Sequence, residues 1–218
     1  MNAVLFDMGV VEYGQALELQ RSLAEKRARD EVGDALLLLE HPHVITLGRK
    51  TSPENLGPQG VPVFSVERGG DATYHGPGQL VGYPIMKLRD HDVRRHVKAI
   101  EKALVNSVGR FGIEAGTLER HPGIWVGGKK LASIGVAVKD WVTFHGFALN
   151  VNTDLSYFNL IRPCGLDPGT MTSMEALLRR RQELEAVKTV VAREFSSATG
   201  QPFVRQSLVS PALGRNIK

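Results

Sequence analysis

Glycine is unevenly distributed along this chain of 218 residues. Of its 23 glycines, 17 lie between Gly57 and Gly169, and the segments before and after them are poor in glycine. Glycine tolerates backbone conformations that other residues avoid, and it lets the backbone approach a neighbouring group closely. We therefore predict that the middle of the chain consists of short elements joined by tight turns.

The spacing of apolar residues predicts the elements themselves. Spacings of three and four residues predict helices over residues 13–31, 93–111 and 183–198. Short apolar runs predict strands over residues 35–39, 44–47, 61–66, 80–88, 124–126, 131–138 and 142–151, with hairpin turns at 127–128 and 139–140. Pro84 predicts that part of its strand is an edge or a bulge. Hairpin-like groups of strands between a few helices predict an α+β (mixed α/β) fold with a central mixed or mostly antiparallel sheet flanked by helices.

Composition limits the class of protein. Apolar residues make up 42% of the chain, which is enough for a sizeable core, so we expect one domain over residues 1–206 and a loose tail over residues 207–218. No apolar stretch is long enough to span a membrane, and the N-terminal segment lacks the basic flank of a signal peptide, so we expect a soluble, cytoplasmic protein. The single cysteine excludes an intramolecular disulfide and a CxxC motif.

The charge distribution bears on the kind of partner. The formal net charge of +4 comes from 27 basic and 23 acidic side chains that are mixed along the chain. Proteins that bind nucleic acids usually cluster their basic residues on one face, so this mixture argues against a nucleic-acid partner. A modestly positive surface instead suits an acidic protein partner.

A glycine-rich segment, RGGDATYHGPGQ, runs from Arg68 to Gln79. Its four glycines and one proline predict a loop whose backbone can pass close to a ligand. The loop also carries a dense set of polar side chains, including Thr73, Tyr74 and His75. Two interpretations stay open at this point: these groups bind a ligand, or Tyr74 and His75 only hydrogen-bond the loop to itself.

Two adjacent lysines follow a glycine turn and enter an apolar strand. Strand alternation places Lys130 and Ala132 on one face and Lys129 and Leu131 on the other. One lysine therefore faces inward or into a cleft, where it can act as a base or hold an anion. The alternative is a pair of solvated lysines at a hairpin turn.

The single cysteine, Cys164, lies in a Pro-Cys-Gly turn. A lone cysteine is most often a small buried hydrophobic residue. A catalytic cysteine instead needs its thiolate stabilised, for which Lys130, His75 and His145 are the candidates. In the segment FHGFALNVN, small residues between apolar ones leave room for an acyl chain or for backbone contact, although ordinary sheet packing is the favoured explanation for Phe147 and Leu149.

Taken in order, RGGDATYHGPGQLVGYP, GKKLASIGV, FHGFALNV and PCG resemble the lipoyl(octanoyl) transferases, the lipoate-protein ligase B type of the biotin/lipoate protein ligase fold superfamily. The resemblance runs from near His41 to about Ser173 and implies that fold. It implies that Cys164 is the nucleophile that carries an acyl group as a thioester, and that Lys130 is its partner. It also implies substrate contacts for Arg68, Gly69, Gly70, Asp71, Ala72, Thr73, Tyr74, His75, Ser133, Ile134, Gly135, Gly146, Phe147 and Ala148.

The implied reaction moves an octanoyl group from acyl carrier protein to a lysine of lipoyl domains, in 2-oxoacid dehydrogenase E2 subunits and in the glycine cleavage H protein. A thioester donor is already activated, so the reaction needs no ATP, no metal and no cofactor. We expect a monomer with no nucleic-acid or membrane partner. Two alternatives remain: an ATP-dependent lipoate or biotin protein ligase, and an acyl-chain-binding module without activity.

Overall fold

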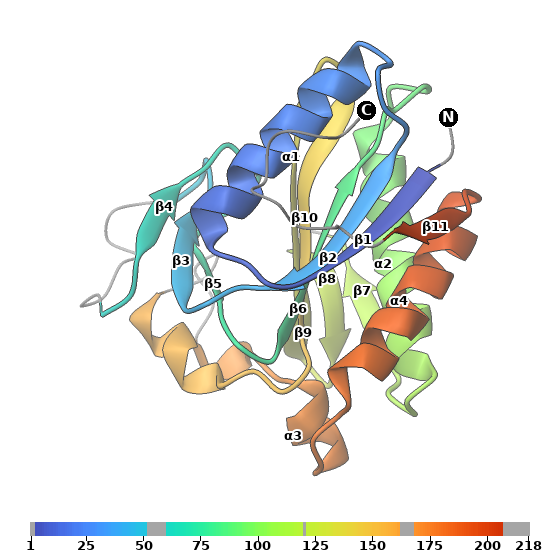
Figure 1. The fold of residues 1–218 in the computed structure, drawn as a ribbon. Coiled ribbons are helices and arrows are strands. Elements are labelled where there is room, and N and C mark those ends of the chain that lie inside the picture. The colour runs from blue at the N-terminus through green and yellow to red at the C-terminus, as the bar shows by residue number, and fades with distance from the viewer. Residues whose placement is uncertain (1–2, 52–59, 120, 162–167, 207–218) are drawn as a thin grey trace.

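The computed structural model describes residues 3–51, 60–119, 121–161 and 168–206, which form two β-sheets with α-helices around them (Figure 1). The helices are α1 (Tyr13–Ala28), α2 (Val93–Gly109), α3 (Met174–Leu178) and α4 (Leu184–Thr199). The strands are β1 (Ala3–Val10), β2 (Ala35–Glu40), β3 (Val44–Leu47), β4 (Val63–Ser65), β5 (Thr73–His75), β6 (Gln79–Ile85), β7 (Gly116–Leu118), β8 (His121–Val126), β9 (Lys129–Lys139), β10 (Val142–Asn150) and β11 (Phe203–Gln206). The 3-10 helices Leu155–Leu160 and Pro168–Thr170 follow β10.

The large sheet has the strand order β11-β1-β2-β6-β10-β9-β8-β7. Strand β1 pairs in parallel with β2 and with β11, and the other neighbours in this sheet are antiparallel, so the sheet is mixed, as predicted. Strands β4, β3 and β5 form the smaller sheet. Because β5 belongs to the glycine-rich segment, the small sheet holds the middle of that segment.

Helices cover both faces of the large sheet. Figure 1 shows α1 on one face and α2 with α4 on the other. Strand β2 explains why both faces need covering: Leu36 and Leu38 lie in the core beneath α2 and α4, whereas Leu37 and Leu39 lie in the core beneath α1. Successive side chains of a strand point to opposite faces, so a continuously apolar strand has to be buried on both.

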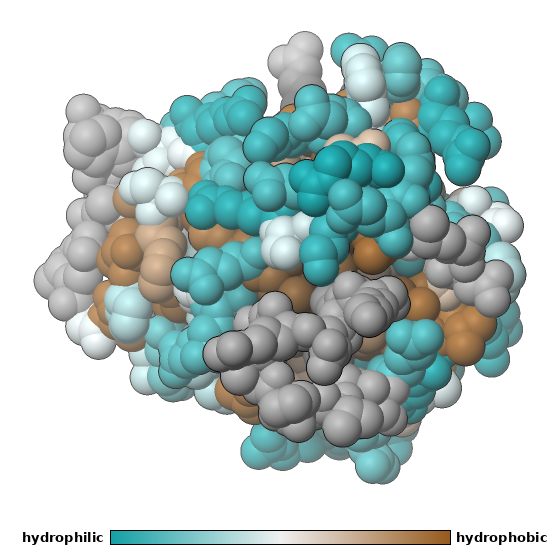
Figure 2. All heavy atoms as spheres, turned by 45° about the horizontal axis from the view of Figure 1, so that its top comes forward, coloured by the Kyte–Doolittle hydropathy of each residue, from teal (hydrophilic) through white to brown (hydrophobic). Residues whose placement is uncertain are grey.

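One face of the molecule is mainly polar (Figure 2). Figure 2 shows a face on which hydrophilic side chains predominate and hydrophobic ones lie mostly in the gaps between them. Within the described ranges, no helix combines the length and the apolar character that crossing a bilayer requires.

The predicted helices and strands are confirmed, with ends that differ by a few residues. The second hairpin turn lies one residue later than predicted, at Asp140 and Trp141, both of which have positive φ. Local sequence patterns do not predict β1, β5, β7, β11 or α3. Strands β1 and β11 come from opposite ends of the chain and pair through Ala3 and Phe203, a contact that local periodicity does not reveal. The predicted tail, residues 207–218, lies outside the described residues.

The prediction that Pro84 marks an edge or a bulge is wrong. Strand β6 lies between β2 and β10, and its register with β10 is the same before and after Pro84. The ladder between β6 and β10 covers only residues 79–82 of β6, and a bridge between Lys87 and Val142 follows the gap. In the gap, the Thr143 hydroxyl donates to the Pro84 carbonyl at 2.7 Å and accepts the Met86 N–H at 3.1 Å. A central strand therefore tolerates this proline, because a side chain replaces the missing backbone pairing.

Gly82 in β6 is paired with Phe147 in β10. A Cβ atom on Gly82 would lie 2.1 Å from the Phe147 ring, so only glycine lets this ring lie against the strand. The ring is 3% exposed and belongs to the main core. Gly82 therefore fixes the position of a large side chain in the centre of the sheet.

Replacing Gly82 with alanine is expected to lower the free energy of unfolding by about 1–3 kcal/mol, because the new methyl group has to displace the Phe147 ring. Urea unfolding followed by circular dichroism measures the change. Gly109→Ala is the matched control: Gly109 is the last residue of α2, and a Cβ there meets no atom within 4 Å. Alanine at that position should be neutral or stabilising by up to about 1 kcal/mol. Equal destabilisation by the two substitutions would contradict the packing argument.

Candidate active site

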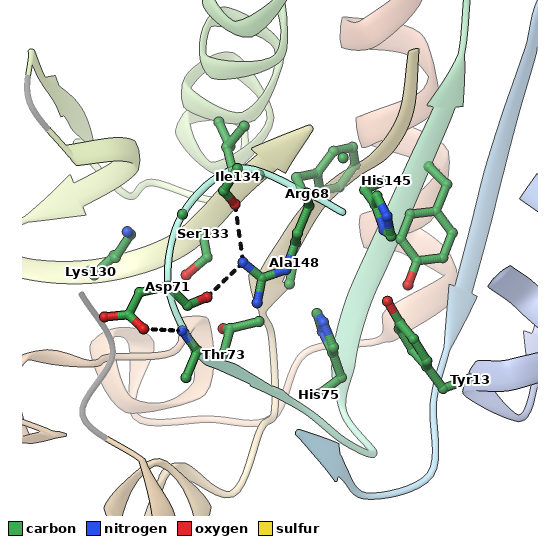
Figure 3. Close-up of a pocket in the computed structure, with 17 residues that line it drawn as sticks. Tyr13, Arg68, Asp71, Thr73, His75, Lys130, Ser133, Ile134, His145 and Ala148 are labelled. Atoms are coloured by element: carbon green, nitrogen blue, oxygen red, sulfur yellow. Dashed lines mark hydrogen bonds between the residues drawn. The ribbon is translucent and has the colours of Figure 1, made fainter. Parts of the chain in front are cut away.

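A pocket lies between the glycine-rich loop and strands β9 and β10 (Figure 3). Every substrate-contacting residue predicted above, except Tyr74, lines this pocket: Arg68, Gly69, Gly70, Asp71, Ala72, Thr73, His75, Ser133, Ile134, Gly135, Gly146, Phe147 and Ala148. Lys130 lines it as well. Cys164 lies outside the described residues.

The Arg68 side chain holds the loop in shape. Its guanidinium is buried and donates to the carbonyls of Gly69 at 3.1 Å, Asp71 at 2.7 Å and Thr46 at 2.8 Å. Thr46 lies on β3, so these bonds join the loop to the small sheet. Bonds from a charged donor are stronger than those between neutral groups, so Arg68 organises the backbone of the pocket wall.

Glycines allow the loop to touch β9 directly. The Gly69 N–H donates to the Val136 carbonyl at 3.0 Å. A Cβ on Gly135, which lies on β9, would be 2.9 Å from the Gly69 carbonyl oxygen. Gly48, which follows β3, makes a second close approach to the loop, because a Cβ there would be 2.4 Å from the Gly70 carbonyl oxygen. The loop and strand therefore meet backbone to backbone, which is the close approach that the clustered glycines predict.

The neighbouring residues Tyr74 and His75 differ in which of the two interpretations of the loop they fit. Tyr74 is fully buried, its hydroxyl lies 2.7 Å from His43 Nδ1, and its ring stacks on Tyr157. Tyr74 therefore belongs to the packing of the small sheet. His75 does both: it lines the pocket, and its Nδ1 lies 2.8 Å from Gln79 Oε1.

Lys130 is the lysine that turns inward. Its side chain is 6% exposed, whereas Lys129 is exposed, as strand alternation predicts. The Nζ atom lies 5.3 Å from the centre of the Trp125 ring, a distance at which a cation is attracted to the ring face. Gly123, at φ +137, makes room for the stem, since a Cβ there would lie 2.9 Å from Lys130 Cε.

The described residues on either side of 162–167 lie beside the pocket. Ile161 and Met171 are both buried in one cluster with Ala72 of the loop. Met171 forms a bridge with Lys130, and the Thr172 N–H donates to the Lys130 carbonyl at 3.0 Å. The segment that contains Cys164 is thus flanked by residues that contact the loop and the backbone of Lys130.

At the far end of the pocket from Lys130 lie Tyr13 and His145 (Figure 3), and Tyr83 lines it too. The sequence analysis misses Tyr13 and Tyr83 as site residues and considers His145 only as a partner of the thiol. Tyr13 lies on α1, far from the loop in sequence, so no local motif signals it. His145 is marked by its backbone in the structure, since it has a φ of +55° in the middle of β10, where a residue other than glycine rarely adopts a positive φ.

Burial keeps these polar rings uncharged. It raises the pKa of Tyr13 to about 12 and raises that of Tyr83 well above its usual value. It also lowers the pKa of His145 to about 4 and that of His75 well below 6.5. The pocket wall also includes the apolar side chains of Ile134, Phe147 and Ala148. The histidine and tyrosine rings of the pocket are therefore neutral at pH 7, and the other ionisable side chains in its wall are Arg68, Asp71 and Lys130.

No group of three or more His, Cys, Asp or Glu side chains within the described ranges is arranged to hold a metal ion.

Comparison with known proteins gives a consistent result. The sequence model of the lipoyl protein ligase A/B catalytic domain family matches residues 12–196. The octanoyltransferase of Solibacter usitatus is 50% identical over 204 residues, which cover 89% of this chain and 92% of that protein. The octanoyltransferase of Geobacter metallireducens is 46% identical over 209 residues, 94% of this chain and 98% of that protein.

Solved structures show the fold. A lipoate-protein ligase A bound with ATP superposes with a TM-score of 0.75 at 19% identity, covering 96% of this chain and 90% of that one. The biotin protein ligase of Aquifex aeolicus superposes with a TM-score of 0.54 at 11% identity, covering 92% and 69% of the two chains. The predicted ligase-like fold is thereby confirmed.

The buried His145 predicts a specific pH dependence of stability. Its folded pKa is about 4, below the unfolded value of 6.5, so between these values the unfolded chain binds a proton that the folded protein does not. Stability should therefore fall as the pH decreases from 6.5 to 4, and each such group contributes up to about 1.4 kcal/mol per pH unit. His145→Asn removes this titration and tolerates positive φ, so the slope of unfolding free energy against pH should become shallower in urea titrations.

His91→Asn is the matched control, because His91 also has positive φ, at +56, but is exposed. His91→Asn measures what the substitution itself does at positive φ, and the His145→Asn slope should be shallower than the His91→Asn slope. Identical slopes for the wild type and for both variants would show that His145 titrates normally in the folded protein.

Proposed function

The chain belongs to the lipoyl protein ligase A/B catalytic domain family, and we propose that it is an octanoyltransferase that supplies the acyl group for protein lipoylation. The observation that carries the proposal is the position of Lys130. This lysine is buried at one end of a largely neutral pocket, and its backbone is bonded to the residues that follow the cysteine segment. Octanoyltransferases that match at 46–50% identity over nearly their whole length support the same activity.

In this proposal Cys164 carries the acyl group. The thiolate attacks the carbonyl carbon of an octanoyl thioester, the new C–S bond forms, and the bond to the carrier sulfur breaks. The leaving carrier thiolate takes a proton from the Lys130 ammonium and departs as a thiol, which leaves Lys130 as a neutral amine. The two thioesters are similar in energy, so this step is nearly balanced and requires no ATP.

The second step forms the amide. A neutral lysine amine of the acceptor protein attacks the acyl-cysteine, the C–N bond forms, and the C–S bond to Cys164 breaks. The attacking nitrogen loses one proton. Lys130 holds the Cys164 thiolate before acylation and takes up this proton afterwards, which is general base catalysis.

The pocket suits an octanoyl chain because its lining matches an apolar, uncharged ligand. Burying the six methylene groups of the chain against residues such as Ile134 and Phe147 contributes about 5 kcal/mol in transfer free energy. This binding energy would hold the carbonyl carbon at the Lys130 end of the pocket.

The proposed partners are octanoyl-acyl carrier protein as donor, and lipoyl domains of 2-oxoacid dehydrogenase E2 subunits and of the H protein as acceptors. The chain has a net charge of +4. Arg49 and Lys50 are exposed. They lie beside the pocket, because their backbone N–H groups donate to the carbonyls of Arg68 and Gly70 in the loop. Cations at that position favour the approach of an acidic carrier.

Replacing Cys164 with serine is expected to abolish octanoyl transfer from octanoyl-acyl carrier protein to a lipoyl domain in the absence of ATP. The wild type, incubated with donor alone, should gain the mass of one octanoyl group, and the variant should not. Intact-protein mass spectrometry and a gel-shift assay of the lipoyl domain measure the two effects.

The same assay separates the alternatives. Full transfer by the serine variant would exclude the cysteine mechanism. Transfer by the wild type from free octanoate only with ATP and Mg²⁺ would instead identify a ligase. An absence of both adduct and turnover in the wild type would favour an acyl-binding module.

Lys130→Met is expected to lower the rate of transfer by about 100-fold or more, because the site loses its general base. Lys129→Met is the matched control, since it removes the same charge from the adjacent, exposed position. The control should keep the wild-type rate. Loss of activity in the Lys129 variant with full activity in the Lys130 variant would reverse the assignment of the two lysines.

A further inference from the structure

A buried hydrogen-bond network leads from the pocket to the residues that follow the cysteine segment. His75 Nδ1 lies 2.8 Å from Gln79 Oε1, and Gln79 Nε2 lies 3.0 Å from Asn150 Oδ1. Asn150 Nδ2 in turn lies 3.0 Å from the Thr172 carbonyl oxygen. Gln79 and Asn150 are each only 1% exposed. The network therefore joins the pocket wall to Thr172 through two side chains that are shielded from bulk water.

The direction of every bond follows from the Thr172 end. A carbonyl oxygen only accepts, so Asn150 presents its NH2 group to Thr172 and its oxygen to Gln79. Gln79 must then donate through its own NH2 group, which also reaches the Tyr74 carbonyl at 3.1 Å. Its oxygen faces His75 and requires a donor there, so the His75 proton lies on Nδ1.

The network thereby determines what His75 offers to the pocket. With the proton on Nδ1, the other ring nitrogen, Nε2, is an acceptor. Burial holds the pKa of His75 well below 6.5, so the ring is neutral at physiological pH. His75 lines the pocket as a neutral acceptor in a single tautomer.

The other end of the network lies against Lys130. Thr172 is held on two sides, because its carbonyl accepts from Asn150 and its N–H donates to the Lys130 carbonyl at 3.0 Å. The preceding residue, Met171, forms a bridge with Lys130. Asn150 and Lys130 together fix the position of the chain directly after residues 162–170.

We propose that Gln79 and Asn150 are positioning residues that fix the tautomer of His75 and hold the chain after Cys164 in register with Lys130. Neither side chain lines the pocket, so both act through His75 and Thr172. The inference rests on the proposed function, because it takes Cys164 and Lys130 as the reacting pair. Residues that react with each other from two separate segments need bonds that fix the segments relative to each other, since a displacement of about 1 Å costs about 100-fold in rate. We call the bonds of Thr172 to Asn150 and to Lys130 the clamp.

Asn150→Leu tests the clamp, because leucine has a similar size and makes none of these bonds. The expected result is a fall in kcat of about 10- to 100-fold with a nearly unchanged KM for octanoyl-acyl carrier protein. Asn152→Leu is the matched control: the Asn152 side chain donates to the Gln182 carbonyl at 2.8 Å and accepts its N–H at 2.9 Å. The control removes an equivalent clamp on a different segment, so it should lower the melting temperature but keep the wild-type kcat per folded molecule.

A spectroscopic measurement tests the tautomer without any variant. The 15N shifts of His75 in the wild type should show a protonated Nδ1 and an unprotonated Nε2. In Gln79→Met, which lacks the acceptor oxygen, the Nε2–H tautomer should increase.

Either of two results would overturn the inference: a wild-type His75 protonated on Nε2, or equal kcat values for the Asn150 and Asn152 variants. If the Asn150 variant fails to fold, the 15N shifts of His75 in the wild type decide the test. A wild type without any octanoyl transfer would instead count against the proposed function, whatever the tautomer.

Discussion

The hydrogen bond from Gly69 to Val136, at 3.0 Å, attaches the glycine-rich loop to strand β9. It forms because Gly135 carries no side chain at the point of contact, and because the buried Arg68 guanidinium bonds the carbonyls that give the loop its shape. Residues of the loop and of β9 thereby line the same pocket. The wall, the inward position of Lys130 and the placement of His75 all belong to surfaces that this bond brings together.

The electrostatics of the pocket follow from burial. Two histidines have lowered pKa values and two tyrosines have raised ones, and burial is the largest cause in every case. Low dielectric surroundings disfavour the charged form of each ring, so the polar groups remain as neutral donors and acceptors. Such a lining suits an uncharged ligand, and the arginine and lysine side chains in the wall are Arg68 and Lys130.

Much of the fold is predictable because its elements have clear local patterns. The run of leucines in β2 has the apolar sequence of a strand buried on both faces, and α2 has the spacing of an amphipathic helix. Pairing between distant segments is not predictable in this way. Strands β1 and β11 form a parallel pair across nearly the whole chain, and Pro84 sits in a central strand because Thr143, on another strand, completes the bonding.

The sequence by itself determined the order of motifs, the residues of the loop and the opposite orientation of Lys129 and Lys130, because these depend on composition and on the two-residue period of a strand. Which lysine turns inward was decided by the tertiary structure, in which Lys130 is buried. Only the tertiary structure decided that Tyr74 packs into the small sheet while its neighbour His75 lines the pocket, and that Tyr13 and His145 lie at the pocket's far end. It also decided the direction of the Gln79–Asn150 hydrogen bonds. The physical reason is that a carbonyl oxygen can only accept, so Thr172 orients two amides and one imidazole that lie far from it in sequence.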